Sequence, residues 1–141
     1  MIDLSGDIEA AINSSFADQL IVLVATSSKA GVPDIAYKGS AMVFDSEHMA
    51  WWERAHGQTL RNVEENPNVC LLYRNPNPEN RKMLKIFGVV ELHRDGPVRQ
   101  QIMDKTVEAE LNRDPERKGV AVCIRVDKVI SLGQVIMERD A

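Results

Sequence analysis

Short extended segments separated by turns, rather than by long helices, are the feature of this sequence that most limits its fold. Residues 19–27 are rich in isoleucine, valine and leucine and end in turn-forming residues. Residues 33–44 resume an extended pattern, residues 45–47 form a predicted turn, and residues 48–53 form a further short strand. Strands joined by such tight turns favour antiparallel pairing.

Three more strands are predicted in the second half of the chain. Residues 69–73 form the first, and residues 83–93 form a longer, bent strand in which Gly88 marks a bulge. Apolar residues then alternate with other residues over 120–126, which indicates a half-buried strand that continues toward Met137.

Helices are predicted at three places. Apolar residues recur at helical spacing in residues 4–16 and 97–112, and Pro97 suits the first turn of the second of these helices. Residues 59–65 form a short helix, because Pro67 disfavours the helical conformation in the residue before it.

This order of elements lacks the regularly alternating crossover helices of a doubly wound parallel sheet. A closed or partly closed antiparallel barrel with helices at its ends removes exposed strand edges most simply. We therefore predict a mainly β fold with helices, of the α+β class. The 141 residues suit one domain, spanning residues 1–141.

Charge and composition exclude several kinds of partner and site. The chain has 17 basic and 21 acidic residues, a net charge of −4, and its basic residues are scattered, so neither nucleic acid nor a membrane is an expected partner. Its N-terminus lacks the features of a secretory signal and its longest apolar run is too short to span a bilayer, so we expect a cytoplasmic protein. Cys70 and Cys123 lie in apolar runs and are expected to be buried thiols, and no metal-ligand spacing occurs.

The segment from Ala50 to Val69 contains both tryptophans, just ahead of the short predicted helix. Trp51 and Trp52 should point to opposite faces of an extended strand, one into the core and the other toward the mouth of the helix. Thr59 is a candidate N-cap, and the free backbone N–H groups of a helix start bind phosphate readily. The same residues are also compatible with an ordinary helix start that binds nothing.

Several segments together resemble one family. TLRNVEENPNV resembles the Lys-Thr-x-x-Asn-Leu-x-x-Asn-Pro-x-Val pattern of the pyridoxamine 5'-phosphate oxidase-like, flavin mononucleotide (FMN)-binding split-barrel family. The matching residues are Thr59, Asn62, Val63, Asn66, Pro67 and Val69. ATSSKAGVPDIAYKGSAMVFD resembles the family's first hairpin, and VCLLYRNP and FGVVELHRDGP resemble its later barrel strands, so the resemblance covers residues 16–132.

The resemblance implies an antiparallel split β-barrel that binds FMN at the interface of a homodimer, with a deazaflavin as a possible alternative cofactor. It places Lys38 at the phosphate, Gly39 and Ser40 beside the isoalloxazine ring, and Gln58 and Thr59 in the phosphate turn. With residues nearby in the sequence, the predicted cofactor-binding set is Lys38, Gly39, Ser40, Trp52, Arg54, Gln58, Thr59 and Arg61.

Two departures from the family pattern limit what the resemblance implies. Gln58 stands where the family has a lysine, and one lost charge-assisted hydrogen bond costs about 1.5–3 kcal/mol. Lys38, Arg54 or Arg61 could supply the missing charge. The C-terminal GQVIMERDA lacks the Arg-x-His signature of enzymes that oxidise pyridoxamine phosphate, so another substrate is expected.

Two functions follow from these observations. The first is a small flavoprotein oxidoreductase acting on an unidentified substrate, in which the cofactor supplies the chemistry and no catalytic residue is assigned. The second is a non-catalytic barrel dimer that binds a flavin, a deazaflavin or a haem-like ligand. His48, His56 and His93 are expected to be polar strand-end or loop residues, with His56 nearest the phosphate turn.

Overall fold

The computed structural model describes residues 1–140. The strands are β1 (Val22–Ser27), β2 (Pro33–Lys38), β3 (Met42–Asp45), β4 (His48–Glu53), β5 (Asn68–Asn75), β6 (Lys82–His93), β7 (Val120–Ser131) and β8 (Gln134–Glu138). The helices are α1 (Asp7–Asn13), α2 (Gln58–Glu65), α3 (Gly96–Lys105) and α4 (Glu108–Leu111).

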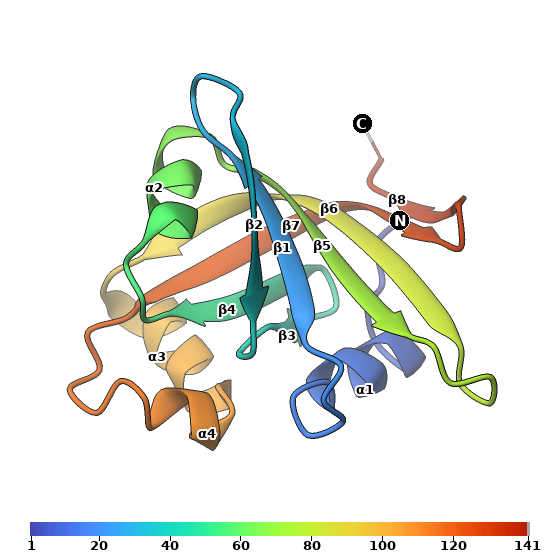
Figure 1. The fold of residues 1–141 in the computed structure, drawn as a ribbon, viewed down its shortest axis with the longest axis horizontal. Helices are drawn as coiled ribbons and strands as arrows, with labels where there is room; N and C mark the ends of the chain where they lie inside the picture. Colours follow the sequence, from blue (N-terminus) through green and yellow to red (C-terminus); the bar gives the residue numbers. More distant parts are fainter. Residues whose placement is uncertain (141) are drawn as a thin grey trace.

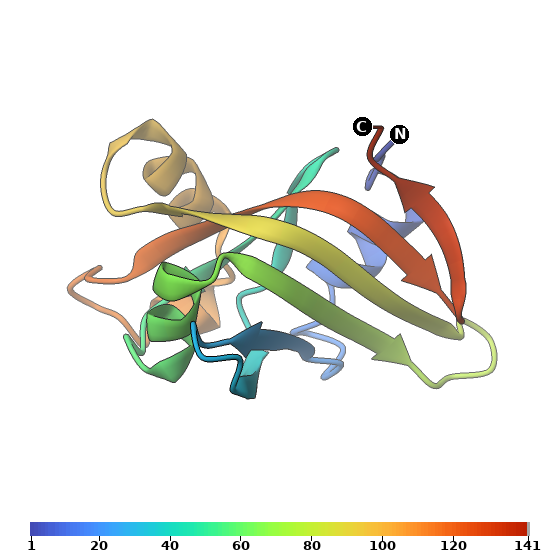
Figure 2. The same cartoon turned by 90° about the horizontal axis from the view of Figure 1, so that it is seen from above.

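All strands belong to one antiparallel sheet with the order β2-β1-β5-β6-β7-β4-β3, and β8 pairs with β7. The long strands β6 and β7 carry the curvature of the sheet, and α2 and α3 lie near the same end of these strands (Figures 1 and 2). The result is an antiparallel, curled half-barrel with a few helices. The predicted split-barrel fold of the α+β class is confirmed.

The extended run predicted over residues 33–44 is two strands rather than one. β2 ends at Lys38 and pairs with β1, whereas β3 begins at Met42 and pairs with β4. A turn closed by the Ala41 N–H and the Lys38 carbonyl, 3.1 Å apart, separates them. Because β2 and β3 are the two ends of the sheet order, this turn carries the chain from one end of the sheet to the other.

The helix predicted over residues 97–112 is also interrupted. Thr106 is extended, with ψ of 136°, and its hydroxyl donates to the Ile102 carbonyl at 2.8 Å. This break separates α3 from α4 and lets α4 take a different direction. The helix predicted over 4–16 is shorter than expected, and the strand predicted from residue 19 starts at Val22, since Gln19 adopts a positive φ of 61° in a turn.

The predicted bulge at Gly88 is confirmed. The register between β6 and β7 shifts between Phe87 and Gly88. A Cβ at position 88 would overlap with the carbonyl oxygen of Arg125 and the side chain of Ile124, so only glycine fits where the two backbones approach this closely.

Two apolar clusters lie on opposite faces of the sheet. The larger cluster fills the inside of the curl and includes Trp51, which is fully buried. The smaller one lies on the outer face, beneath α3, and includes Trp52 and Ile102. Trp52 is also buried, with 3% exposure. Because the two tryptophans belong to clusters on opposite faces, the prediction that they point to opposite faces is confirmed. The prediction that one of them faces the mouth of α2 is not, because both rings are packed.

Helix α1 protects the edge strand β3. The Asn13 side chain accepts a hydrogen bond from the Val43 N–H at 2.8 Å and donates to the Val43 carbonyl at 3.4 Å, as a neighbouring strand would.

The two ends of the described chain meet, since the Met1 amino group donates to the Glu138 carbonyl at 2.7 Å (Figure 1). Within residues 1–140, every helix is too short or too polar to cross a bilayer.

Candidate functional site

Predicted site residues from distant parts of the chain meet at one small pocket, which we call the rim pocket. Its volume is about 120 Å³. The residues that line it are Tyr37, Lys38, Gly39, Ser40, Trp52, Glu53, Arg54, Ala55 and Glu110. They come from the end of β2 and the turn after it, from the end of β4, and from α4. Lys38, Gly39, Ser40, Trp52 and Arg54, all chosen from the sequence, therefore lie together.

Lys38 is held by a buried carboxylate. Its ammonium group lies 2.9 Å from Oε1 of Glu53, and the two side chains are only 13% and 1% exposed. The same Glu53 oxygen accepts a hydrogen bond from the Trp51 indole at 3.1 Å. Glu53 lies two residues after Trp51 on β4 and so points to the same face of the sheet. The charge expected to bind a phosphate is thus already neutralised within the protein.

The side chain of Ser40 is bound to the backbone of Trp52. The Ser40 hydroxyl accepts from the Trp52 N–H at 2.9 Å and donates to the Trp52 carbonyl at 3.2 Å. The Trp52 indole donates to Asp114 at 2.9 Å, and the Arg99 guanidinium lies over its ring at 4.8 Å from the centroid. These contacts fix the turn after β2 to β4 and hold Trp52 in place on the outer face.

Asp114 organises the segment that follows α4. Partial burial raises the pKa of Asp114, but hydrogen bonds from the Lys118 N–H, the Trp52 indole and the Gly119 N–H outweigh burial and lower that pKa below its ordinary value. The ionised carboxylate therefore ties the chain before β7 to the outer face of β4.

Arg54 is paired with an acidic residue that sequence reasoning missed. Its Nε lies 3.4 Å from Oε2 of Glu110, whose side chain is 13% exposed. Oε1 of Glu110 covers Gly39 so closely that a Cβ at position 39 would overlap with it. Both carboxylate oxygens of Glu110 therefore lie against residues that were predicted to contact the cofactor.

The start of α2 differs from the sequence-based prediction. Thr59 is not the N-cap: α2 begins at Gln58, and Gly57 is the cap residue without a side-chain hydrogen bond. Thr59 lies inside the first helical turn, where it is buried. The surroundings of Gly57 are open, since a Cβ at this position would meet no neighbouring atom within 4 Å. The helix therefore starts two residues earlier than a Thr59 cap would require.

Gln58 and Arg61 do not line the rim pocket. The Gln58 amide donates to Asn62 at 2.7 Å, and the Arg61 guanidinium donates to the Gln58 amide oxygen at 3.2 Å. Asn62 in turn donates to the buried Thr26 hydroxyl at 3.0 Å. These side chains run along α2 and fasten it to β1.

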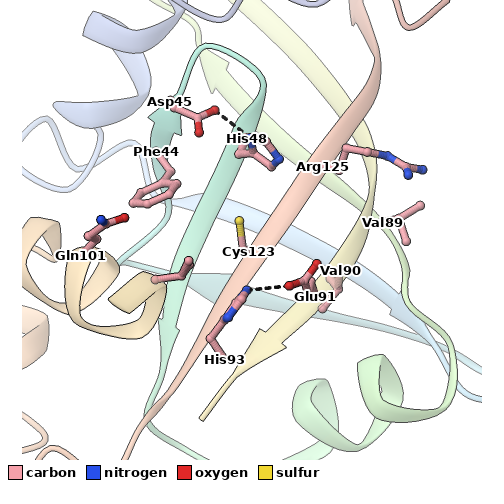
Figure 3. Close-up of a pocket in the computed structure, with 11 residues that line it drawn as sticks. Phe44, Asp45, His48, Val89, Val90, Glu91, His93, Gln101, Cys123 and Arg125 are labelled. Atoms are coloured by element: carbon pink, nitrogen blue, oxygen red, sulfur yellow. Dashed lines mark hydrogen bonds and ion pairs between the residues drawn. The ribbon is translucent and has the colours of Figure 1, made fainter. Parts of the chain in front are cut away.

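A larger pocket of about 470 Å³ lies on the outer face between β3, β4, β6, β7 and α3 (Figure 3). It contains two histidine–carboxylate pairs, His48 with Asp45 at 2.7 Å and His93 with Glu91 at 3.0 Å. Cys123 lies between them (Figure 3). The residues of the predicted cofactor-binding set all lie outside the lining of this pocket.

The thiols are not activated. Burial, together with the nearby charges of Asp45 and Glu91, raises the pKa of Cys123 to about 11. Burial also raises the pKa of Cys70. Both cysteines are free, Cys123 buried and Cys70 half-buried, and both are protonated at neutral pH. His56, the third histidine, contacts the Lys118 carbonyl at 3.0 Å and has a positive φ of 52°.

The comparisons with known proteins fit this arrangement. A model of the pyridoxamine 5'-phosphate oxidase family matches residues 8–132. The chain belongs to this family. An uncharacterised protein of Methanocaldococcus jannaschii is 31% identical over 116 residues, which cover 79% of this chain and 72% of that protein.

Solved structures share the fold of this family member at low sequence identity. A pyridoxamine 5'-phosphate oxidase-related, FMN-binding protein of Nostoc punctiforme has a TM-score of 0.73 and 13% identity, and the alignment covers 94% of this chain and 85% of that one. A HupZ variant from Group A Streptococcus has a TM-score of 0.70 and 20% identity, covering 92% of this chain and 99% of that one.

The rim pocket fits FMN only in part. Two cations, Lys38 and Arg54, are groups that bind a phosphate ester well. Both are paired with carboxylates, however, and about 120 Å³ is well below the roughly 300–1,000 Å³ of pockets that enclose a drug-sized ligand. The rim pocket has space for a phosphate-sized group but not for the whole nucleotide.

The buried pair generates a first prediction. Lys38→Met should lower the free energy of unfolding by about 3 kcal/mol, because it leaves the Glu53 carboxylate buried with only the Trp51 indole as partner. Urea denaturation measures this change, with Lys29→Met at an exposed lysine as control. The double variant Lys38→Met/Glu53→Gln should recover most of the loss. A Lys38→Met protein as stable as the wild type would show that the pair is unimportant.

A second prediction concerns Asp114 and pH. Its lowered pKa means that its contribution to stability is fully present above the ordinary value of 3.8 and is lost as pH falls through the lowered pKa. Asp114→Asn should therefore cost about 1–2 kcal/mol at pH 7, and this difference should shrink below about pH 4. Urea denaturation from pH 7 to pH 3 tests this, with the exposed Asp104→Asn as control. A cost that does not vary with pH would contradict it.

Proposed function

We propose that this protein is an FMN-binding flavoprotein and a small oxidoreductase that acts on a substrate other than pyridoxamine 5'-phosphate. The observation that carries the proposal is the convergence of Lys38, Gly39, Ser40 and Arg54 on the rim pocket. The family resemblance gives Lys38 to the phosphate of the cofactor and the two residues after it to the ring. Membership of the family and the FMN-binding relative from Nostoc punctiforme support the same conclusion.

Bound FMN would supply hydride or electron transfer, so the protein itself needs to bind, orient and shield it. Arg54 would supply the positive charge at the phosphate, and Lys38, although paired with Glu53, would lie beside it. The hydrogen bonds between Ser40 and Trp52 would hold the turn beside the ring in a fixed conformation. The raised pKa values of Cys70 and Cys123, which keep both thiols protonated, are compatible with such a division of roles.

A non-catalytic dimer that binds a flavin, a deazaflavin or a haem-like ligand is the second candidate. It is favoured by Gln58, which replaces the family's lysine and is bound to Asn62. Reduction of the bound cofactor by nicotinamide nucleotides distinguishes the two functions. Turnover of the reduced cofactor with an added acceptor supports the enzyme, whereas a bound cofactor that is never reduced supports the binding protein.

We further propose a homodimer that uses β2. This strand is at one end of the sheet order, and its outward side chains include Ile35 and Tyr37, which are 65% and 72% exposed. An edge strand with exposed apolar side chains pairs readily with another chain. A second protomer beside β2 would lie next to the rim pocket, which Tyr37 and Lys38 line, and would supply the wall that one protomer lacks.

The FMN site predicts a selective effect of Arg54. Titration of the wild-type protein with FMN should quench the flavin fluorescence, and Arg54→Ala should weaken FMN binding by roughly tenfold or more, because a charge-assisted hydrogen bond to the phosphate is lost. Binding of riboflavin, which has no phosphate, should change little. Arg113→Ala, at an exposed arginine after α4, is the matched control. Absence of FMN binding, or equal binding by Arg54→Ala, would refute the site.

The dimer predicts a specific disruption at β2. Light scattering should give the mass of a dimer for the wild-type protein, and Ile35→Lys should shift it toward the monomer, because a charge would replace an apolar contact at the interface. Val135→Lys, at an exposed residue of β8 on another edge, should leave the dimer intact. A monomeric wild-type protein, or a dimer unaffected by Ile35→Lys, would contradict the proposal.

A further inference from the structure

We propose that Glu110 is an internal anion that occupies the place of the ligand's phosphate beside Arg54. The carboxylate and an incoming phosphate would then compete for the same cation. Glu110 would thus set how strongly the site prefers a phosphorylated flavin over an unphosphorylated one. This inference rests on the proposed function and assigns a specificity-determining role to a residue that the family resemblance does not include.

The position of the carboxylate is the first observation. Oε2 of Glu110 lies 3.4 Å from Nε of Arg54, and Oε1 covers the backbone of Gly39. The side chain is 13% exposed, so the group is largely withdrawn from water. An anion thus already lies between the turn after β2 and the end of β4, where the resemblance places the cofactor.

The backbone of α4 is anchored independently of this carboxylate. Leu111 packs against the outer cluster, and the Arg117 guanidinium donates to the carbonyls of Leu111 at 3.0 Å and Asp114 at 2.7 Å. Asp114 is bound in turn to Trp52. From this anchored segment the Glu110 side chain reaches into the rim pocket, so its carboxylate can leave Arg54 without unfolding α4.

The two carboxylates of the pocket differ in how firmly they are held. Glu53 is almost completely buried and accepts from both Lys38 at 2.9 Å and Trp51 at 3.1 Å. Glu110 has the longer contact of 3.4 Å, made with Arg54, whose side chain is 36% exposed. An incoming anion would therefore displace Glu110 rather than Glu53.

Charge explains why the two anions exclude each other. The ionised groups of the rim pocket are Lys38 and Arg54 against Glu53 and Glu110, which balance to zero. A phosphate monoester adds about −1.5 to −2 charges at neutral pH. If Glu110 stayed in place, Arg54 would face two anions at once, and their repulsion would weaken binding of the phosphate. A neutral ligand would not incur this repulsion.

The experiment compares FMN and riboflavin binding by the full-length wild-type protein, Glu110→Gln and Glu108→Gln. Glutamine keeps the size of the side chain and removes its charge, and the exposed Glu108 on the same helix is the control for net charge. Glu110→Gln should tighten FMN binding by roughly tenfold and riboflavin binding by less than about threefold. Glu108→Gln should change both affinities by less than about twofold. In an Arg54→Ala background, the gain from Glu110→Gln should be smaller, because no cation is left to compete for and only the direct repulsion between carboxylate and phosphate is relieved.

The outcomes separate this inference from the proposed function. FMN binding with the same affinity to the wild-type protein and Glu110→Gln overturns the inference alone. Equal gains for FMN and riboflavin also overturn it, because Glu110 would then act by blocking space and not by competing with phosphate. Failure of FMN to bind to any of the proteins overturns the proposed function, and the inference with it. Urea denaturation of each variant confirms that the comparison is made between folded proteins.

Discussion

The two-sided burial of β4 is the constraint on which the rest of the structure depends. Trp51 fills the inside of the curled sheet and Trp52 packs on its outer face, so both clusters are built on one strand. Pairing of Trp51 with Val122 and of Trp52 with Ala121 on β7 sets the register. A slip by one residue would exchange the faces and move Glu53 away from Lys38. The packing of two large aromatic residues therefore also fixes the geometry of the rim pocket.

The ion pair between Lys38 and Glu53 closes the half-barrel at this rim. Lys38 ends β2, the first strand in the sheet order, and Glu53 ends β4, which lies near the other end of that order. β2 and β4 are not neighbours in the described sheet. The buried ion pair and the Ser40–Trp52 contacts therefore hold the two ends of the sheet together. A buried ion pair adds little net stability but strongly disfavours arrangements that separate the charges. The residues that close the half-barrel therefore also line the rim pocket.

The sequence predicted what short-range patterns determine. Alternation and turn residues indicated the antiparallel strands and the bulge at Gly88, and the family resemblance and its neighbouring residues selected Lys38 and Arg54, which the structure brings together. It did not predict the break after Lys38, the break at Thr106 or the acidic partners, because these depend on contacts between distant segments. Alternation from Trp51 could have placed Glu53 inside. Nothing local could have placed Glu110, whose position depends on how α4 packs against β4.

Gln58 stands where the family pattern has a lysine, and the hydrogen bonds of its side chain explain the glutamine. Its amide both donates to Asn62 and accepts from Arg61, a combination that lysine, which only donates, cannot provide. Through Asn62 and Thr26 this side chain helps to fasten α2 to the sheet. The positive charge at the rim pocket then comes from Lys38 and Arg54, each already paired with a carboxylate. An anion that bound here under the proposed function would have to compete with those carboxylates, and Glu110, with its 3.4 Å contact, is the one that is held less firmly.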